Sequence, residues 1–280
     1  MTAGVRHLVK LLTPPILTAF ARSAATRFGA DAGRAAVGLE GDYPSWQAAA
    51  ADATGYDAAD ILRRVIAATR RVVADPSLYE RDSVVFNEVQ YSWPLLAALL
   101  QVALEAQRLR VIDFGGALGS SWRQNSRFLR RLKLGIAWTV VEQPGFVAAG
   151  KAEFEDEVLR FADTITAASR RGVDVVLLAS SLCYVPEPKA VVAEAAAVGA
   201  QYLILDRIPT TRSGRDRIAV QNVTEPIYTA SYPVWIFDES RLLSHWLQGW
   251  RLIEHWESEL QPDPRVRHRG FFLERMNDGK

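Results

Sequence analysis

Short apolar runs alternate with helical patterns from about residue 108 to residue 207, and each apolar run ends in a cluster of polar residues. The runs are RVIDFGG, AWTVVEQ, DVVLLASS and YLILDR, with LRFADTI as a weaker fifth candidate. The helical patterns between them include SSWRQNSRFLRRL and PKAVVAEAAAVG. Apolar strands that alternate with helices predict a parallel sheet covered on both faces. A later helix, DESRLLSHWLQG, and two strand candidates, RLIEHWE and GFFLERM, predict a closing hairpin.

The residues before this pattern are predicted to be helical. Two alanine-rich segments precede Asp75, with Gly55 between them and Asp57 placed to cap the second. WPLLAALLQVALEAQ follows as an amphipathic helix with Pro94 in its first turn, where a missing N–H costs little. We therefore expect a helical N-terminal region or cap at 1–85 and an α/β domain at 86–280.

Composition excludes several classes of function. Of the 280 residues 49% are hydrophobic and 23% are charged, which suits a globular protein with a sizeable core. The formal net charge of +1 offers no global attraction to nucleic acid. The single cysteine, Cys183, excludes an intrachain disulfide and a multi-cysteine zinc site, and no histidine pair has metal-ligand spacing. We expect a cytoplasmic protein with no metal, no nucleic-acid partner and no membrane-spanning helix.

The first thirty residues contain Arg6, Lys10, Arg22 and Arg27 but no acid, and apolar residues surround these basic ones. Lys10 and the Pro14–Pro15 pair interrupt the apolar stretch that a signal peptide needs. Two interpretations remain. One is a weak peripheral anchor to an anionic membrane, which would place the protein at the inner membrane face. The other, which we favour, is a helical arm packed on the protein.

Ligands of an open parallel sheet bind beyond the carboxyl ends of its strands. The first run ends in Asp113-Phe-Gly115-Gly116-Ala-Leu-Gly119, and such glycines let a ligand approach the backbone closely. The dinucleotide fingerprint G-x-G-x-x-G is not satisfied in this segment. Asp113 can accept hydrogen bonds from a ligand ammonium, directly or through water. A cofactor with an amino-acid end therefore suits this loop better than one with a pyrophosphate.

The other strand ends supply further candidates for the same cofactor. Glu142 and Gln143 close the second run, where a carboxylate can bind both hydroxyls of a ribose. Residues at Ala162 and Asp163 could meet an adenine, and the fourth run ends in Ser180 and Ser181. The predicted cofactor site comprises Asp113, Gly115, Gly116, Gly119, Glu142, Gln143, Ala162, Asp163, Ser180 and Ser181.

These clusters, in this order, resemble the successive motifs of class I S-adenosylmethionine-dependent methyltransferases. The segments that carry the resemblance are DFGGALG, VVEQ, DVVLLASSLCYVPEP, YLILDR and DESRLLSHWLQGWRLIEHWES, and they span about residues 86 to 275. The resemblance implies a Rossmann-like seven-stranded sheet, S-adenosyl-L-methionine as cofactor, and methyl transfer. One departure is Ala117, which replaces the middle glycine of the usual loop. Close approach of a ligand survives there if Ala117 has a negative φ.

A narrower resemblance is to a bacterial family of methyltransferases with a DFGG cofactor loop, often associated with surface-polysaccharide loci. It is carried by ERDSVVFNEVQYSWPLL, LDRIP and SYPVWIF. This family implies a sugar or glycan acceptor and O-methylation.

Two residues are the catalytic candidates. Asp206 ends the fifth run and could act as the base for a hydroxyl acceptor, or it could form a structural pair with Arg207. Tyr184 stands after the fourth strand, where it would orient the substrate or wall the pocket.

The acceptor is expected under a lid. The stretch 208–237 shows no helical period and is long for a connection, which is typical of a functional loop. We expect it to cover the strand ends as an irregular lid. The predicted acceptor-binding residues are Tyr91, Trp93, Arg207, Arg212, Tyr228, Tyr232 and Trp235.

The sequence thus predicts methyl transfer to a hydroxyl of a sugar or glycan intermediate. Two alternatives stay open. One is a methyltransferase for a small-molecule secondary metabolite, and the other is a catalytically silent module that binds the cofactor or a partner.

Overall fold

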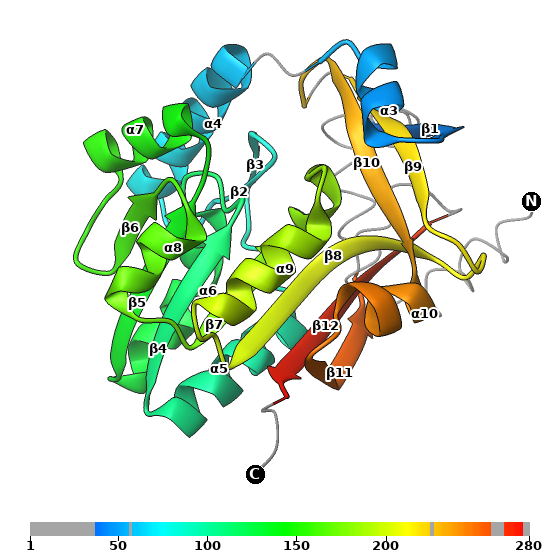
Figure 1. Cartoon of the computed structure of the whole chain (residues 1–280). Helices are drawn as coiled ribbons and strands as arrows, with labels where there is room; N and C mark the ends of the chain where they lie inside the picture. Colours follow the sequence, from blue (N-terminus) through cyan, green and yellow to red (C-terminus); the bar gives the residue numbers. More distant parts are fainter. Residues whose placement is uncertain (1–36, 56–57, 225–226, 259–265, 277–280) are drawn as a thin grey trace, which may run out of the picture.

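The computed structural model describes residues 37–55, 58–224, 227–258 and 266–276 (Figure 1). The helical elements of this part are α3 (Trp46–Asp52), α4 (Ala58–Ala74), α5 (Trp93–Ala106), α6 (Ser120–Leu129), η1 (Arg130–Leu132), α7 (Pro144–Glu153), α8 (Ile165–Ala168), η2 (Ser169–Arg171), η3 (Leu182–Tyr184), α9 (Pro188–Ala197), α10 (Glu239–Arg241) and η4 (Leu242–Trp246). The strands are β1 (Val37–Tyr43), β2 (Tyr79–Arg81), β3 (Val84–Phe86), β4 (Arg108–Phe114), β5 (Gly135–Val141), β6 (Leu159–Ala162), β7 (Val175–Ala179), β8 (Tyr202–Thr211), β9 (Arg217–Val223), β10 (Ala230–Asp238), β11 (Trp250–Glu257) and β12 (Arg267–Arg275).

The central sheet has the Rossmann-like seven-stranded arrangement that the sequence predicts. Its strands follow the order β6-β5-β4-β7-β8-β12-β11. The first five run parallel, whereas β12 runs antiparallel to both β8 and β11. The five predicted apolar runs are β4 to β8, and the predicted closing hairpin is β11 with β12. From β4 the chain winds outward through β5 to β6, then returns to β7 on the other side, so a topological switch point lies between β4 and β7.

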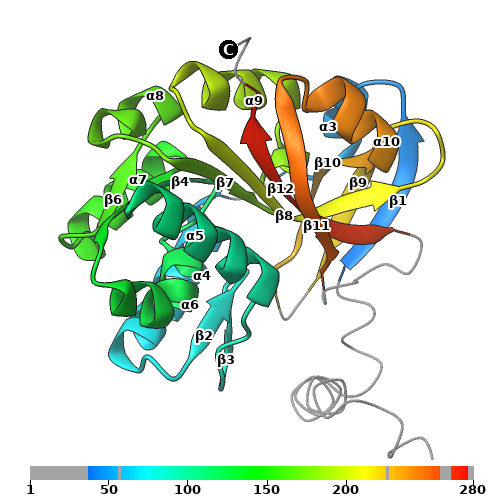
Figure 2. The same cartoon turned by 90° about the horizontal axis from the view of Figure 1, so that it is seen from below.

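Helices cover both faces of this sheet, because alternate residues of each strand point to opposite sides (Figure 2). On one face, α4, α5, α6 and α7 bury residues such as Leu99 and Trp122 against Val111 and Leu177. On the other face, α8, α9 and η4 pack on residues such as Val176. Burial of each large aliphatic side chain contributes about 1.5–3 kcal/mol, so these two apolar layers hold the strand ends in place.

An antiparallel extension replaces the irregular lid that the sequence led us to expect over 208–237. β8 is long, and its last residues leave β7 and pair with the end of β10 through Thr210 and Thr211. β10 then pairs with β9, and β9 pairs with β1 (Figure 1). The expectation was wrong because backbone hydrogen bonds between these strands satisfy the segment as a sheet.

The expectation of an entirely helical region before residue 86 was also wrong. The helices α3 and α4 lie at the two predicted segments, but β1 joins the main sheet beside β9, with Val37 opposite Val223. The strands β2 and β3 form a separate two-stranded hairpin. Strand pairing with a partner far along the chain decided the structure of β1. The proposed arm at 1–30 and the capping residue Asp57 lie outside the described residues.

Among the described helices, none combines the length and the apolar character that a bilayer crossing requires. Cys183 belongs to η3 and is buried in an apolar layer of the core, and burial raises the pKa of its thiol to about 12. The thiol is therefore a core side chain and not a reactive group at neutral pH.

Candidate functional site

The candidate site lies at the carboxyl ends of β4 and β7, on either side of the topological switch point. The loop from Gly115 to Gly119 leaves β4 and leads directly into α6. Its first residue is tied to the next strand, because the Gly115 N–H donates to the Val141 carbonyl at 2.9 Å. The loop therefore has a defined position against both neighbouring strands.

Two of the loop glycines are required by contacts inside the protein. A Cβ on Gly115 would lie 2.5 Å from the Cβ of Ser181, and Gly115 has a φ of +72°. A Cβ on Gly116 would lie 2.5 Å from the Cγ of Asp113. Real Cβ atoms do not approach other atoms so closely, so β4, the loop and the end of β7 can only pack together with glycine at these positions.

Gly119 and Ala117 both adopt the left-handed backbone conformation. Gly119 has a φ of +92° and begins α6, and a Cβ there would crowd Arg123 and Leu159. Ala117 has a φ of +51° and not the negative φ that close approach of a ligand was expected to require. A non-glycine residue in this region stores strain of about 1–2 kcal/mol. The backbone N–H of Ala117 donates to Glu142 at 3.3 Å, and this bond helps to hold the loop.

Asp113 lies fully buried beneath the loop. One carboxylate oxygen accepts a hydrogen bond from the indole N–H of Trp138 at 3.0 Å. The other has no partner among the described residues. Burial raises the pKa of Asp113 to about 7, against the lowering effect of the Trp138 bond. Asp113 supports the loop from below, and because its carboxylate has no exposed surface, contact with a ligand ammonium through water fits this position better than direct contact.

Glu142 closes β5 with its carboxylate folded back on the backbone. It accepts hydrogen bonds from the N–H of Gln143 at 2.8 Å and from the loop at Ala117. Burial raises the pKa of the Glu142 carboxyl. Ala162 is buried at the end of β6 and accepts the Glu142 N–H, whereas Asp163 is exposed one residue later. The residues predicted to meet ribose and adenine thus stand side by side at one edge.

The end of β7 faces the loop. Ser180 has a φ of +58°, and its hydroxyl accepts a hydrogen bond from the Arg207 Nε at 2.9 Å. The Oγ of Ser181 is buried against Gly115 and has no partner among the described residues. Buried polar atoms without partners are rare in proteins, and they point to a water or a ligand. Ser181, against Gly115, and Asp113, against Gly116, supply one such atom each.

Asp206 has no free oxygen with which to accept a proton. Its side chain is only 1% exposed, one oxygen accepts the indole N–H of Trp256 at 2.9 Å, and the other pairs with Arg207 at 2.9 Å. The structure therefore supports the alternative interpretation of Asp206 as a structural partner of Arg207, and it argues against the base. The Arg207 side chain keeps 15% exposure, so the pair presents its cationic member to the site.

Tyrosines and an amide form a polar wall next to η3. The Tyr184 hydroxyl donates to Gln221 at 3.0 Å, and the Gln221 amide donates to the Tyr232 hydroxyl at 3.3 Å. The rings of Tyr184 and Tyr232 meet edge to face, and the Tyr228 hydroxyl lies 3.3 Å from that of Tyr232. The structure thus brings together three of the predicted residues, and β9 adds Gln221.

Four predicted acceptor-binding residues lie elsewhere. Tyr91 and Trp93 pack on Phe128, near the end of α6 that is remote from the loop. Trp235 stacks between Trp46 and other aromatic side chains of the extension.

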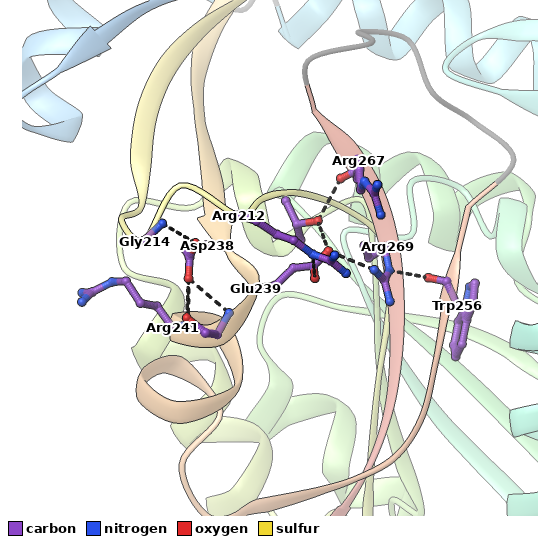
Figure 3. A network of polar contacts seen from close by, with 10 residues as sticks. Arg212, Gly214, Asp238, Glu239, Arg241, Trp256, Arg267 and Arg269 are labelled. Atoms are coloured by element: carbon purple, nitrogen blue, oxygen red, sulfur yellow. Dashed lines mark hydrogen bonds and ion pairs between the residues drawn. The ribbon is translucent and has the colours of Figure 1, made fainter.

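Arg212 pairs with Glu239 at 2.9 Å, and Glu239 also binds Arg269 at 2.9 Å (Figure 3). This network joins the ends of β8, β10 and β12, and so anchors the extension to the sheet. Sequence position could not distinguish Arg212 and Trp235 from the residues of the polar wall, because both lie close in the chain to Tyr228 and Tyr232.

A hairpin that the sequence argument left without a function also reaches the site. The β2–β3 hairpin has Asp82 and Ser83 at its tip. Burial raises the pKa of Tyr184 and Tyr228, that of Tyr228 to about 12, and the negative charge of Asp82 adds to both effects. The tip is therefore close to the tyrosine wall. The signal in the sequence was the polar pair Asp82-Ser83 between the segments YER and VVF.

No protein-family model and no curated protein sequence matches this chain. Among solved structures, the chain is similar to the N-terminal domain of EvdMO1, crystallised in the presence of SAH and D-fucose, at 18% identity and a TM-score of 0.47 over 79% of this chain and 98% of that one. It is similar to a SAM-dependent methyltransferase from Methanosarcina mazei at 13% identity and a TM-score of 0.46, over 68% and 99%. It is similar to SAM-bound CalS10, an amino pentose methyltransferase from Micromonospora echinaspora, at 17% identity and a TM-score of 0.40, over 66% and 92%.

Proposed function

We propose that this chain binds S-adenosylmethionine across the Gly115–Gly119 loop and transfers its methyl group to a hydroxyl of a sugar or glycan intermediate. The observation that carries the proposal is the pair of partnerless buried atoms, Asp113 Oδ1 and Ser181 Oγ, beside the adjacent glycines Gly116 and Gly115 at the switch point. Glycines at these positions also leave no side chain between the loop backbone and a ligand.

The strand-end residues fit the parts of this cofactor. Glu142 at the end of β5 can exchange its backbone bonds for the two hydroxyls of the ribose. Ala162 and Asp163 at the neighbouring edge would flank the adenine. When bound, the cofactor supplies an activated methyl group on a sulfonium. The protein's own residues therefore have to align an acceptor and exclude water.

The polar wall supports an acceptor with several hydroxyls. Tyr184, Gln221, Tyr228 and Tyr232 offer hydroxyl and amide groups that both donate and accept hydrogen bonds, together with flat ring faces. Such a mixture can bind a polar ring through its edges and its faces. Arg207, which pairs with Asp206 and donates to Ser180, keeps part of its guanidinium exposed as a further hydrogen-bond donor.

Isothermal titration calorimetry tests the cofactor assignment. We expect S-adenosylmethionine and S-adenosylhomocysteine to bind, and NAD to fail, because the loop lacks the dinucleotide fingerprint. Glu142→Gln should weaken the binding of both S-adenosylmethionine and S-adenosylhomocysteine by about 1–3 kcal/mol, the usual effect of losing one partner of a buried charge-assisted bond. Glu88→Gln, which removes an exposed carboxylate outside the cofactor site, is the control for net charge. Binding of NAD in place of the two nucleosides would contradict the proposal.

Transfer of labelled methyl groups to methyl glycosides of common hexoses and 6-deoxyhexoses tests the acceptor class. Transfer to a glycoside oxygen is the expected result. Cofactor binding without transfer to any of these glycosides, but with transfer to aromatic metabolites, would favour the secondary-metabolite alternative. Binding without any transfer would favour the silent module.

A further inference from the structure

The β2–β3 hairpin holds its two tip residues in a fixed, strained conformation. Asp82 has a φ of +52° and Ser83 a φ of +65°, the pattern of a two-residue type I′ turn. Asparagine and glycine are the usual residues at these positions. Aspartate also visits the left-handed region, so Asp82 on its own would be an ordinary turn residue.

Buried contacts fix this tip between the cofactor loop and the extension. Glu80 is buried, and its carboxylate accepts the hydroxyl of Ser120, the first residue of α6 after the glycine loop. The same carboxylate accepts the N–H of Ser83 at 3.0 Å. On the other side, the Ser83 hydroxyl donates to the carbonyl of Ile227 at 3.3 Å, next to Tyr228. The position of the tip is therefore set by the loop and by the polar wall together.

Asp82 is the other residue of this tip, next to Ser83. It is exposed, and within the described part of the chain it forms neither a hydrogen bond nor an ion pair. Burial is the largest cause of the raised pKa of Tyr232 and Tyr184, and the charge of Asp82 contributes to both. Asp82 and Asp113 both act electrostatically on Arg207. The acid is therefore close both to Arg207 and to the tyrosine wall.

These contacts distinguish Asp82 from the other acids at the strand ends. Asp206 is 1% exposed with both oxygens bonded, and Asp113 is fully buried. Glu142 binds two backbone N–H groups at the opposite edge. Of Asp82, Asp113, Glu142 and Asp206, only Asp82 combines an accessible carboxylate with a position beside the tyrosine wall.

We propose that Asp82 is the catalytic carboxylate that faces the sulfonium of the bound cofactor and accepts the proton of the acceptor hydroxyl. The inference rests on the proposed function. In the transfer, the bond between the acceptor oxygen and the methyl carbon forms as the bond between that carbon and sulfur breaks. The electron pair of the broken bond stays on sulfur, and the hydroxyl proton passes to the Asp82 carboxylate.

Comparison of S-adenosylmethionine with S-adenosylhomocysteine tests the position of Asp82 without any acceptor. Only the first carries the sulfonium charge. Asp82→Asn should weaken S-adenosylmethionine by roughly three- to tenfold, the effect of removing one unit charge several Å away at a protein surface, and leave S-adenosylhomocysteine unchanged. Asparagine tolerates the left-handed conformation, so the turn survives the substitution. Glu88→Gln removes an exposed carboxylate shortly after β3 and is the matched control.

Methyl transfer to the glycoside panel tests the proton acceptor. Asp82→Asn should lower the rate at saturating cofactor by about 100-fold or more, in the range of general-base catalysis, while Glu88→Gln retains full rate. Unchanged preference between the two nucleosides, equal weakening of both, or an undiminished rate in Asp82→Asn would each overturn the inference and leave the proposed function standing. Failure of the unmodified chain to bind either nucleoside would overturn both.

Discussion

Replacing Asp113 with asparagine should change how the stability of the protein depends on pH. The folded-state pKa of this carboxyl is about 7 because of burial, against an ordinary value of 3.8. Between these two values the folded protein keeps a proton that the unfolded chain releases. The contribution of Asp113 to stability therefore falls as pH rises from about 4 to about 7 and is constant above that range.

The size of the effect follows from the shift. Most of the shift lies above pH 5, so between pH 5 and pH 8 the unmodified protein should lose about 3 kcal/mol of unfolding free energy through this group, at 1.36 kcal/mol per pKa unit. Asparagine does not titrate, and its amide oxygen can still accept the Trp138 N–H. Any fixed cost of the substitution cancels when the difference between the two proteins is followed with pH.

Denaturant unfolding at constant ionic strength measures this difference at pH 5, 6, 7 and 8. We expect the unfolding free energy of Asp113→Asn, relative to that of the unmodified protein, to rise by about 3 kcal/mol from pH 5 to pH 8. Asp163→Asn, which removes an exposed carboxylate at the end of β6, controls for net charge. A constant difference between Asp113→Asn and the unmodified protein at all four pH values would refute the reasoning, because it would mean that Asp113 titrates alike in both states.

Further predictions concern the loop, the strand ends and the N-terminus. Gly116→Ala would place a Cβ 2.5 Å from the carboxylate carbon beneath it, and should cost about 1–3 kcal/mol of stability and weaken S-adenosylmethionine in calorimetry. Asp206→Asn should lower the unfolding free energy by about 3 kcal/mol, because the charge of Arg207 is left without its buried counter-ion, with cofactor affinity retained; loss of turnover at unchanged stability would restore it as the base. Glu142→Ala should weaken the cofactor more than Glu142→Gln, because alanine also frees the loop N–H. If residues 1–30 bind membrane, sedimentation with anionic vesicles should weaken as salt rises; no sedimentation at low salt would favour the packed arm.

Local pattern was sufficient to predict the parallel sheet and the cofactor edge. The runs that became β4, β5, β7 and β8 are apolar because both faces of a central strand are covered, and this requirement is visible in any short window of sequence. Each run ends where the strand reaches solvent, so the polar clusters at Asp113, Glu142 and Ser180 mark one edge of the sheet. Position in the chain therefore predicted position in the fold for these residues.

The partners of the functional side chains were decided only by the tertiary structure. Asp206 was predicted as a base from its place at a strand end, but the indole that occupies one of its oxygens comes from Trp256, fifty residues later. The segment after β8 forms strands because β9 pairs with β1, which precedes it by about 180 residues. Asp82 reached the site because Glu80 and Ser83 fix the hairpin between two distant elements. The burial of a strand can be predicted from the apolar character of its own residues. A hydrogen-bond partner or the direction of a side chain depends on elements that only the folded chain brings together.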